Sequence, residues 1–180
     1  CQSKLLSSNV QVGHVSYLWH TLFAAIFIAY SANLVSDSTS YYLASLNLNE
    51  YDFKFGTNLT YIFTDFLVSQ FHLSYISTSL IFSLFSCLGL VFLYASLREV
   101  SNFNQKFKWI IFMSILLPSI NFWSSGIGKD SIAFFGICLL IWGFINVNKR
   151  FIAIILGFVF LLFIRPHVAV VFLPVLGVLV

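Results

Sequence analysis

The sequence predicts an all-α membrane protein, a polytopic bundle of transmembrane helices, from three observations. Of its 180 residues, 59% are hydrophobic and 8% are charged, against about 25% charged residues in globular proteins. Long stretches contain no Asp, Glu, Lys or Arg, and most can hold the roughly 20 apolar residues of a spanning helix. Aromatic side chains such as Trp19 and Tyr30 lie near the ends of apolar runs, as at membrane interfaces. We therefore predict a single transmembrane domain over residues 1–180.

Apolar runs give the elements in order. Six spans are predicted, at about residues 15–35, 75–97, 107–123, 131–147, 151–164 and 168–180. Between the first two, residues 36–74 form a predicted outer loop that begins with a polar stretch. Over residues 57–72, apolar side chains recur at helical spacing with Asp65 on another side of the helix, which predicts an amphipathic surface helix; a short span is the alternative.

The charged residues predict the orientation of these spans. If the loops around 98–108 and 148–150 are cytoplasmic, the inner side holds six basic residues against three outside. These six are Lys4, Arg98, Lys106, Lys108, Lys149 and Arg150. All acidic residues except Glu99 then lie outside. We therefore expect a multi-pass protein of the inner (cytoplasmic) membrane whose working site is extracytoplasmic.

Several classes of function are excluded or disfavoured. Basic residues form no stripe, so nucleic acid is not an expected partner, whereas the lipid bilayer is. The three cysteines show neither a disulfide framework nor metal-ligand spacing, and His14, His20 and His72 are interpreted as interface residues. We expect no metal site and no cofactor. The chain starts without Met and stops in an apolar run at Val180, which indicates a fragment of a larger protein.

Asp37 is the first candidate functional residue because it directly follows the first predicted span. A carboxylate at the membrane surface can act as a general base toward a sugar hydroxyl or as a metal ligand. The alternative is that Asp37 caps a helix that begins near Ser38, since Asp is a preferred N-cap residue.

A second candidate is the turn at residues 123–130, Trp-Ser-Ser-Gly-Ile-Gly-Lys-Asp. Its glycines, Gly126 and Gly128, are expected to permit positive φ and close approach of a ligand. The turn is not a P-loop, because that motif needs Gly where Trp123 stands and Ser or Thr in place of Asp130. Lys129 at a helix N-terminus suits a phosphate. Alternatively, Asp130 caps the helix and Lys129 reaches toward lipid headgroups.

Arg165-Pro166-His167 interrupts about 30 apolar residues. A guanidinium binds phosphate in a bidentate manner, and His167 could donate to the same anion or act as an acid. Pro166 suits the first turn of a helix. The alternative is an interfacial Arg anchor followed by an ordinary surface histidine.

The segment 117–130, with Arg165-Pro166-His167 downstream and Asp37 plus Tyr41-Tyr42 after the first span, resembles bacterial polytopic envelope-polysaccharide proteins. These are GT-C-type glycosyltransferases that use lipid-phosphate-linked sugars, and the neighbouring O-antigen or exopolysaccharide polymerases. In GT-C enzymes, a long first outer loop carries an acidic catalytic residue. The closely paired second acid common in those enzymes has no clear counterpart here, since Glu50 and Asp52 lack a defining motif.

The resemblance implies a hexosyltransferase-type enzyme that moves a sugar or glycan from a polyprenyl-phosphate carrier to a glycan or lipid acceptor. Asp37 would be catalytic, and the substrate-binding residues would be Tyr41, Lys129, Asp130, Arg165 and His167. A divalent cation on Asp37 and Asp130 is left open. The alternatives are a polymerase, a transporter or flippase of lipid-linked sugars, and a non-catalytic assembly subunit.

Overall fold

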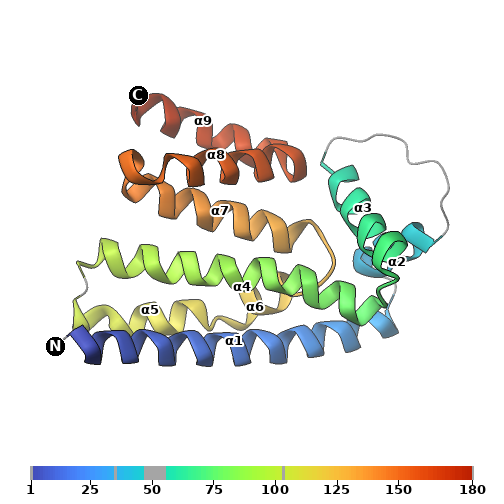
Figure 1. Cartoon of the computed structure of the whole chain (residues 1–180), viewed down its shortest axis with the longest axis horizontal. Coiled ribbons are helices and arrows are strands. Elements are labelled where there is room, and N and C mark those ends of the chain that lie inside the picture. Colours follow the sequence, from blue (N-terminus) through green and yellow to red (C-terminus); the bar gives the residue numbers. More distant parts are fainter. Residues whose placement is uncertain (1, 35, 47–55, 103, 180) are drawn as a thin grey trace.

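A computed structural model describes residues 2–34, 36–46, 56–102 and 104–179, and within these ranges every regular element is helical (Figure 1). The α-helices are α1 (Gln2–Asn33), α2 (Asp37–Leu46), α3 (Asn58–Asp65), α4 (Tyr75–Val100), α5 (Lys108–Ile115), α6 (Pro118–Trp123), α7 (Lys129–Ile145), α8 (Val147–Ile164) and α9 (Pro166–Leu179). A π-helical turn, η1 (Phe66–Gln70), follows α3, and a 3-10 turn, η2 (Gln105–Phe107), precedes α5. The predicted all-α class is confirmed. Glu50 and Asp52 lie outside the described residues.

Three helices in the described ranges are long and apolar enough to cross a membrane: Val12–Asn33 of α1, all of α4, and all of α8. The run predicted at 107–123 is shorter and broken, because Pro118 starts a separate helix, α6, after α5 ends at Ile115. The span predicted at 131–147 corresponds to helix α7, which begins earlier, at Lys129, and contains 17 residues. The structure therefore supports membrane association through three helices rather than the full set of six spans.

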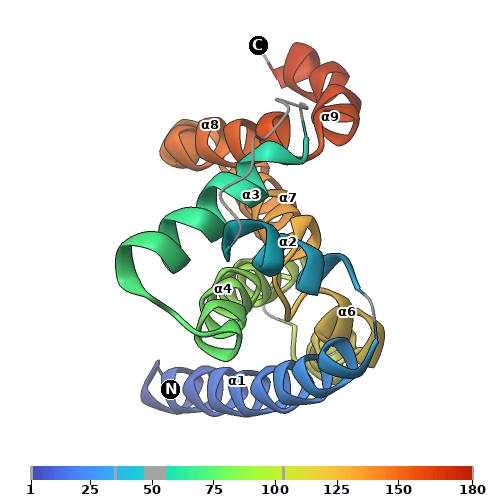
Figure 2. The same ribbon diagram turned by 90° about the vertical axis from the view of Figure 1, so that its right-hand side faces the viewer.

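The long helices lie side by side, with α4 between α1 and α7, and α8 and α9 beyond α7 (Figure 1). One end of the bundle gathers the end of α1, the starts of α4 and α7, and the junction of α8 with α9. Helices α2 and α3 cross this same end, as the view along the bundle shows (Figure 2). We call it the α2–α3 end. The opposite end holds the α4–α5 and α7–α8 connections.

Close helix packing depends on small residues, as in many membrane bundles. A Cβ at Gly157 would lie 2.8 Å from the carbonyl oxygen of Gly136, and a Cβ at Gly143 would lie 2.5 Å from Ile154. These glycines let α7 and α8 approach each other closely. Such packing fixes the start of α7 relative to the end of α8, and both border the candidate site.

A buried polar network connects α1, α4 and α6. His20 is 1% exposed, and its Nδ1 lies 3.1 Å from Oδ1 of Asn121 while its Nε2 lies 2.8 Å from Oγ of Ser86. The Asn121 amide donates to the carbonyl oxygens of Ile115 and Leu117. The interpretation of His20 as an interface residue was therefore wrong, because its two ring nitrogens link three helices inside the bundle.

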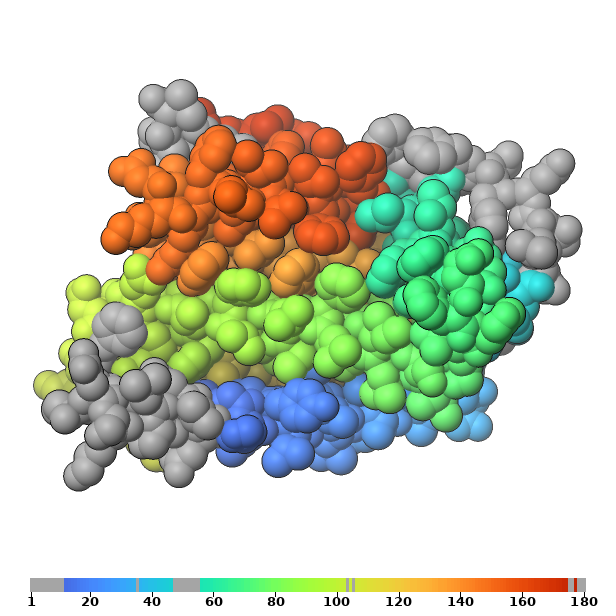
Figure 3. Space-filling model, in the orientation of Figure 1, coloured from blue at the N-terminus to red at the C-terminus, as the bar shows by residue number. Residues whose placement is uncertain are grey.

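The predicted surface helix over 57–72 corresponds to α3 and η1, which lie across one end of the face shown in Figure 3. Its polar side is turned toward the protein: Thr60 and Thr64 are fully buried. Its apolar side chains divide between two sides: Leu67 and Val68 are buried, whereas Ile62 is 53% exposed and Phe66 49% exposed. The exposed apolar side chains on its outer side suit a helix resting on lipid.

Candidate active site

A cavity of about 290 Å³ lies at the α2–α3 end. Five of the six predicted site residues line it: Asp37, Tyr41, Lys129, Asp130 and Arg165. The remaining lining residues are Phe27, Tyr30, Ser36, Ser38, Trp123, Gly126, Ile127 and Gly128. The tertiary structure thus brings together three candidate motifs that are far apart in the sequence. It does not place His167 on this cavity; that residue is exposed near the start of α9.

Asp37 begins α2, but a different residue caps the helix. The backbone N–H of Thr39 donates to Oγ of Ser36 at 3.3 Å, and the N–H of Ser36 donates to Oγ1 of Thr39 at 3.1 Å. This reciprocal pattern is a capping box. The alternative interpretation of Asp37 as the helix cap was therefore wrong, and its exposed carboxylate lines the cavity instead.

Hydrogen bonds to neighbouring helices fix the start of α2. Oγ of Ser38, a residue 2% exposed, lies 2.9 Å from the hydroxyl of Tyr75 on α4. That hydroxyl also lies 2.6 Å from Oγ of Ser31 on α1. Asp37 precedes Ser38 directly, so its backbone position is set by both α1 and α4.

Tyr41 is one helical turn beyond Asp37 and is 5% exposed. Its ring packs edge to face on Tyr61 of α3, with 4.6 Å between ring centroids. Burial, and after it the carboxylate of Asp37, raises the pKa of the Tyr41 phenol above its ordinary value of 10.0. The phenol therefore stays protonated at neutral pH and can act as a hydrogen-bond donor at the cavity wall.

The two glycines of the 123–130 turn have different structural roles. Neither lies in the left-handed region of backbone conformation, so the positive φ expected there is not adopted; among the described glycines, Gly56 has that conformation, with a φ of 87°. A Cβ at Gly126 would lie 1.9 Å from the ring of Phe27 on α1. Gly126 is thus needed for close packing, whereas Gly128 has extended backbone (φ 166°) and open space around its Cβ position.

Lys129 is the first residue of α7, and its Nζ donates to Oγ1 of Thr57 at 2.8 Å. Thr57 precedes α3, so this bond joins two segments 72 positions apart in sequence. Because Thr57 is neutral, the contact leaves the positive charge of Lys129 at the cavity. No local sequence pattern indicates this pairing, because the two segments meet only in the folded chain.

Asp130 and Arg165 form an ion pair between the first turn of α7 and the end of α8. Asp130 makes no capping bond, and Gly128 is the N-cap residue, so the predicted capping role of Asp130 was wrong. A carboxylate in the first turn still interacts favourably with the helix dipole. The four charged side chains of the cavity, two acidic and two basic, sum formally to zero.

Aromatic residues form one wall of the cavity, among them Tyr30, which was predicted to lie at the membrane interface. Phe27 and Tyr30 of α1 pack against Phe122 of α6, with ring centroids 5.3 and 5.5 Å apart. Trp123 is 56% exposed and packs on the same Phe122 ring. Their place in the sequence did not single them out, because aromatic residues are common at membrane interfaces.

A second hollow, of about 250 Å³, adjoins this cavity and shares Trp123, Asp130 and Arg165 with it. Its other lining residues are mainly apolar and come from α6, α7 and α9: Ile120, Ser124, Ala133, Phe134, Ile137 and Val168. We call it the apolar groove. A charged cavity and an apolar groove therefore meet at the Asp130–Arg165 ion pair.

Carboxylates are the natural candidates for binding a metal in this cavity. Asp37 and Asp130 both line it. Among the described residues, no group of three or more His, Cys, Asp or Glu side chains is arranged to hold a metal ion. The geometry therefore offers two carboxylates rather than a complete set of protein ligands.

Comparisons with protein-family models, with curated proteins and with solved structures found no match to this chain.

Proposed function

We propose that this protein is an integral membrane glycosyltransferase that moves a sugar or glycan from a polyprenyl-phosphate carrier to an acceptor during cell-envelope polysaccharide synthesis. The observation that carries the proposal is the meeting of the charged cavity with the apolar groove at Asp130 and Arg165. A polyprenyl-phosphate sugar has the same three parts in the same order: a polar sugar, a phosphate and an apolar chain.

The apolar groove suits the polyprenyl chain. Phe134 and Ile137 on α7 and Val168 on α9 line it, so a chain lying there would run beside two apolar helices toward the bilayer. The cavity beyond Arg165 offers Asp37, Tyr41 and Lys129 as polar partners for a sugar and its acceptor. Trp123 borders both spaces and offers a flat ring surface at the boundary.

The reaction needs one base and positive charge beside the leaving group. An acceptor hydroxyl oxygen attacks the anomeric carbon, its proton passes to the Asp37 carboxylate, and the bond from the anomeric carbon to the phosphate oxygen breaks. The carrier leaves as a polyprenyl phosphate or diphosphate, whose negative charge Lys129 and Arg165 stabilise. Asp130 holds the Arg165 guanidinium in place, which makes Asp130 a positioning residue.

The charges of the free cavity are balanced. With Asp130 paired to Arg165, the cavity holds no large excess of positive charge before substrate binds. A guanidinium has five N–H donors, so Arg165 can keep its bond to Asp130 while donating to a phosphate. Such contacts gain strength in a medium of low dielectric constant, as at the edge of a bilayer.

We further propose that the bundle crosses the inner membrane six times, with the α2–α3 end extracytoplasmic. Helices α7 and α9 and the α5–α6 pair lie alongside the three long apolar helices (Figure 1). The basic residues Lys108 and Lys149 lie in the first turns of α5 and α8 at the opposite end, as expected for a cytoplasmic side.

The test replaces the native gene in its own host with full-length variants and measures polymer and lipid-linked precursor together. We expect Asp37→Asn and Arg165→Gln to abolish polymer while precursor accumulates on the outer leaflet. Lys129→Met has a matched control in Lys149→Met, which removes the same charge at the far end of the bundle. Immunoblots and thermal unfolding of each purified variant separate loss of chemistry from loss of protein.

Other outcomes would point to other functions. Precursor trapped on the inner leaflet in Arg165→Gln would indicate a transporter or flippase and refute the transferase. Normal polymer synthesis in all site variants would indicate that the protein is a non-catalytic structural subunit. Site variants in which single glycan units are added but not extended into polymer would identify a polymerase. The acceptor of a polymerase is itself a lipid-linked glycan.

A further inference from the structure

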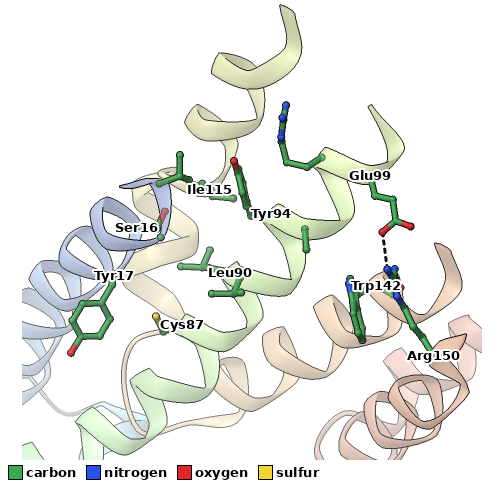
Figure 4. A pocket seen from close by; sticks show the side chains of 14 residues that line it. Ser16, Tyr17, Cys87, Leu90, Tyr94, Glu99, Ile115, Trp142 and Arg150 are labelled. Atoms are coloured by element: carbon green, nitrogen blue, oxygen red, sulfur yellow. Dashed lines mark hydrogen bonds and ion pairs between the residues drawn. The ribbon is translucent and has the colours of Figure 1, made fainter. Parts of the chain in front are cut away.

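A separate cavity of about 350 Å³ lies at the opposite end of the bundle, and Figure 4 shows the side chains around it. Helices α1, α4, α5, α7 and α8 all contribute to its lining. The residues are Val12, Gly13, Ser16, Tyr17, Cys87, Leu90, Val91, Tyr94, Ala95, Arg98, Glu99, Ile115, Trp142 and Arg150. None of them lines the candidate active site, so the two cavities are independent.

The interior of this cavity is apolar and its side is open. Leu90 and Ile115 form its buried floor, at 2% and 1% exposure. Tyr17 on α1 and Val91 on α4 also line it but are 47% and 53% exposed. The cavity therefore reaches the outer surface of the bundle between α1 and α4, where acyl chains surround a membrane protein.

Charged groups lie at one end of the cavity. Arg98, in the last turn of α4, is 3% exposed, and its Nη1 donates to the carbonyl oxygen of Asn104 at 3.4 Å. Arg150 pairs with Glu99 at 2.9 Å and lies over the ring of Trp142 at 4.2 Å (Figure 4). Two arginines and one glutamate leave a formal charge of +1 here. A buried arginine beside an apolar cavity suits an anionic headgroup.

A second observation points to a ligand. Ser16 on α1 is 8% exposed and lines the cavity, and its hydroxyl has no hydrogen-bond partner. Buried hydroxyls in folded proteins are nearly always bonded, so an unsatisfied one calls for an explanation. An oxygen of a bound molecule would supply the missing partner.

We propose that this cavity binds one anionic phospholipid, with its phosphate toward Arg98 and an acyl chain between α1 and α4. The surrounding end of the bundle also carries Lys108 and Lys149, and basic pockets between transmembrane helices are recognised sites for anionic lipid headgroups. A zwitterionic lipid would fill the same apolar space but would bring no net negative charge to Arg98.

The experiment is native mass spectrometry of the purified full-length protein in detergent, titrated with phosphatidylglycerol or with phosphatidylcholine of identical acyl chains. We expect phosphatidylglycerol to bind about tenfold more tightly, because the choline cation of phosphatidylcholine offsets the negative charge that its phosphate would bring to Arg98. Arg98→Gln should remove this preference. Lys106→Gln is the matched control, because it removes an exposed charge at the same end and should leave the preference intact.

A second variant keeps Arg98 and blocks the chain instead. Gly13 lines the cavity, and a Cβ placed there meets no atom within 4 Å, so Gly13→Leu should fold normally. It should weaken the binding of both lipids, an effect that Arg98→Gln alone would not have. This variant also keeps the proposal testable if Arg98→Gln fails to fold.

Three results would overturn the proposal. Equal affinities of the native protein for the two lipids would show that the charge of the headgroup does not determine binding. Complete displacement of phosphatidylglycerol by inorganic phosphate would indicate a site for a soluble anion. Lipid-free protein that forms dimers lost in Gly13→Leu would show that a second copy occupies the cavity.

Discussion

Replacing Gly126 with alanine is the sharpest test of how the structure builds its candidate site. The change adds one methyl group to a turn that also contains Gly128, two positions away. At Gly126, the new Cβ would lie 1.9, 2.3 and 2.8 Å from three atoms of the Phe27 ring. At Gly128, a Cβ meets nothing within 4 Å. The same substitution therefore has opposite consequences at the two positions.

The overlap at Gly126 is too large to be absorbed without movement of a side chain or of the backbone. Phe27 is 8% exposed and packs against Tyr30 and Phe122, so its ring has little space to move into. Overpacking of this kind costs about 1–3 kcal/mol. For a protein of this size, that corresponds to a fall in Tm of roughly 2–12 °C.

Gly128→Ala should be neutral or slightly stabilising. Its φ of 166° is ordinary extended backbone, and alanine there reduces the conformational entropy of the unfolded chain by about 0.4–1 kcal/mol. The two single variants thus differ in sign as well as in size.

The assay is thermal unfolding of the purified protein in detergent, followed by circular dichroism, for Gly126→Ala, Gly128→Ala and Phe27→Leu. The double variant Gly126→Ala with Phe27→Leu is decisive, because removing the ring removes the clash. We expect its destabilisation to be clearly smaller than the sum of the two single effects. Equal Tm values for the two alanine variants, or strict additivity in the double variant, would refute this packing.

Three further predictions concern the charged cavity. Thr57→Val should lower Tm by removing the acceptor for Lys129 Nζ, while Thr57→Ser should restore it; unchanged unfolding in Thr57→Val would show that the bond contributes nothing. Asp130→Asn combined with Arg165→Gln should change stability by only about 0.2–1 kcal/mol, as for other exposed ion pairs, yet should abolish polymer synthesis; a large loss of Tm would instead assign the pair a structural role. The raised pKa of Tyr41 means that its stabilising contribution is complete below about pH 10 and is lost as the pH rises further. Between pH 8 and pH 11, the Tm of Tyr41→Phe should therefore fall less steeply than the Tm of the native protein. Parallel curves of Tm against pH for the two proteins would contradict this.

The sequence predicted the helical class and most helix positions because hydrophobic runs and their flanking residues encode both directly. The second predicted span matches α4, and the predicted surface helix matches α3 with η1. It also identified the charged residues that meet at the cavity, since an ionisable group next to an apolar run is costly and stands out. The prediction of six complete spans is not confirmed, because a new helix, α6, begins at Pro118 and several apolar helices are short.

The sequence by itself determined that this protein is built from apolar helices and that Asp37, Lys129 and Arg165 lie next to the ends of apolar runs. Only the tertiary structure decided their partners. The pairing of Asp130 with Arg165, the bond from Lys129 to Thr57 and the contact of Gly126 with the α1 helix all join segments distant in sequence. Local periodicity carries no information about such contacts, because they depend on how closely the helices pack and on which helix ends that packing brings together.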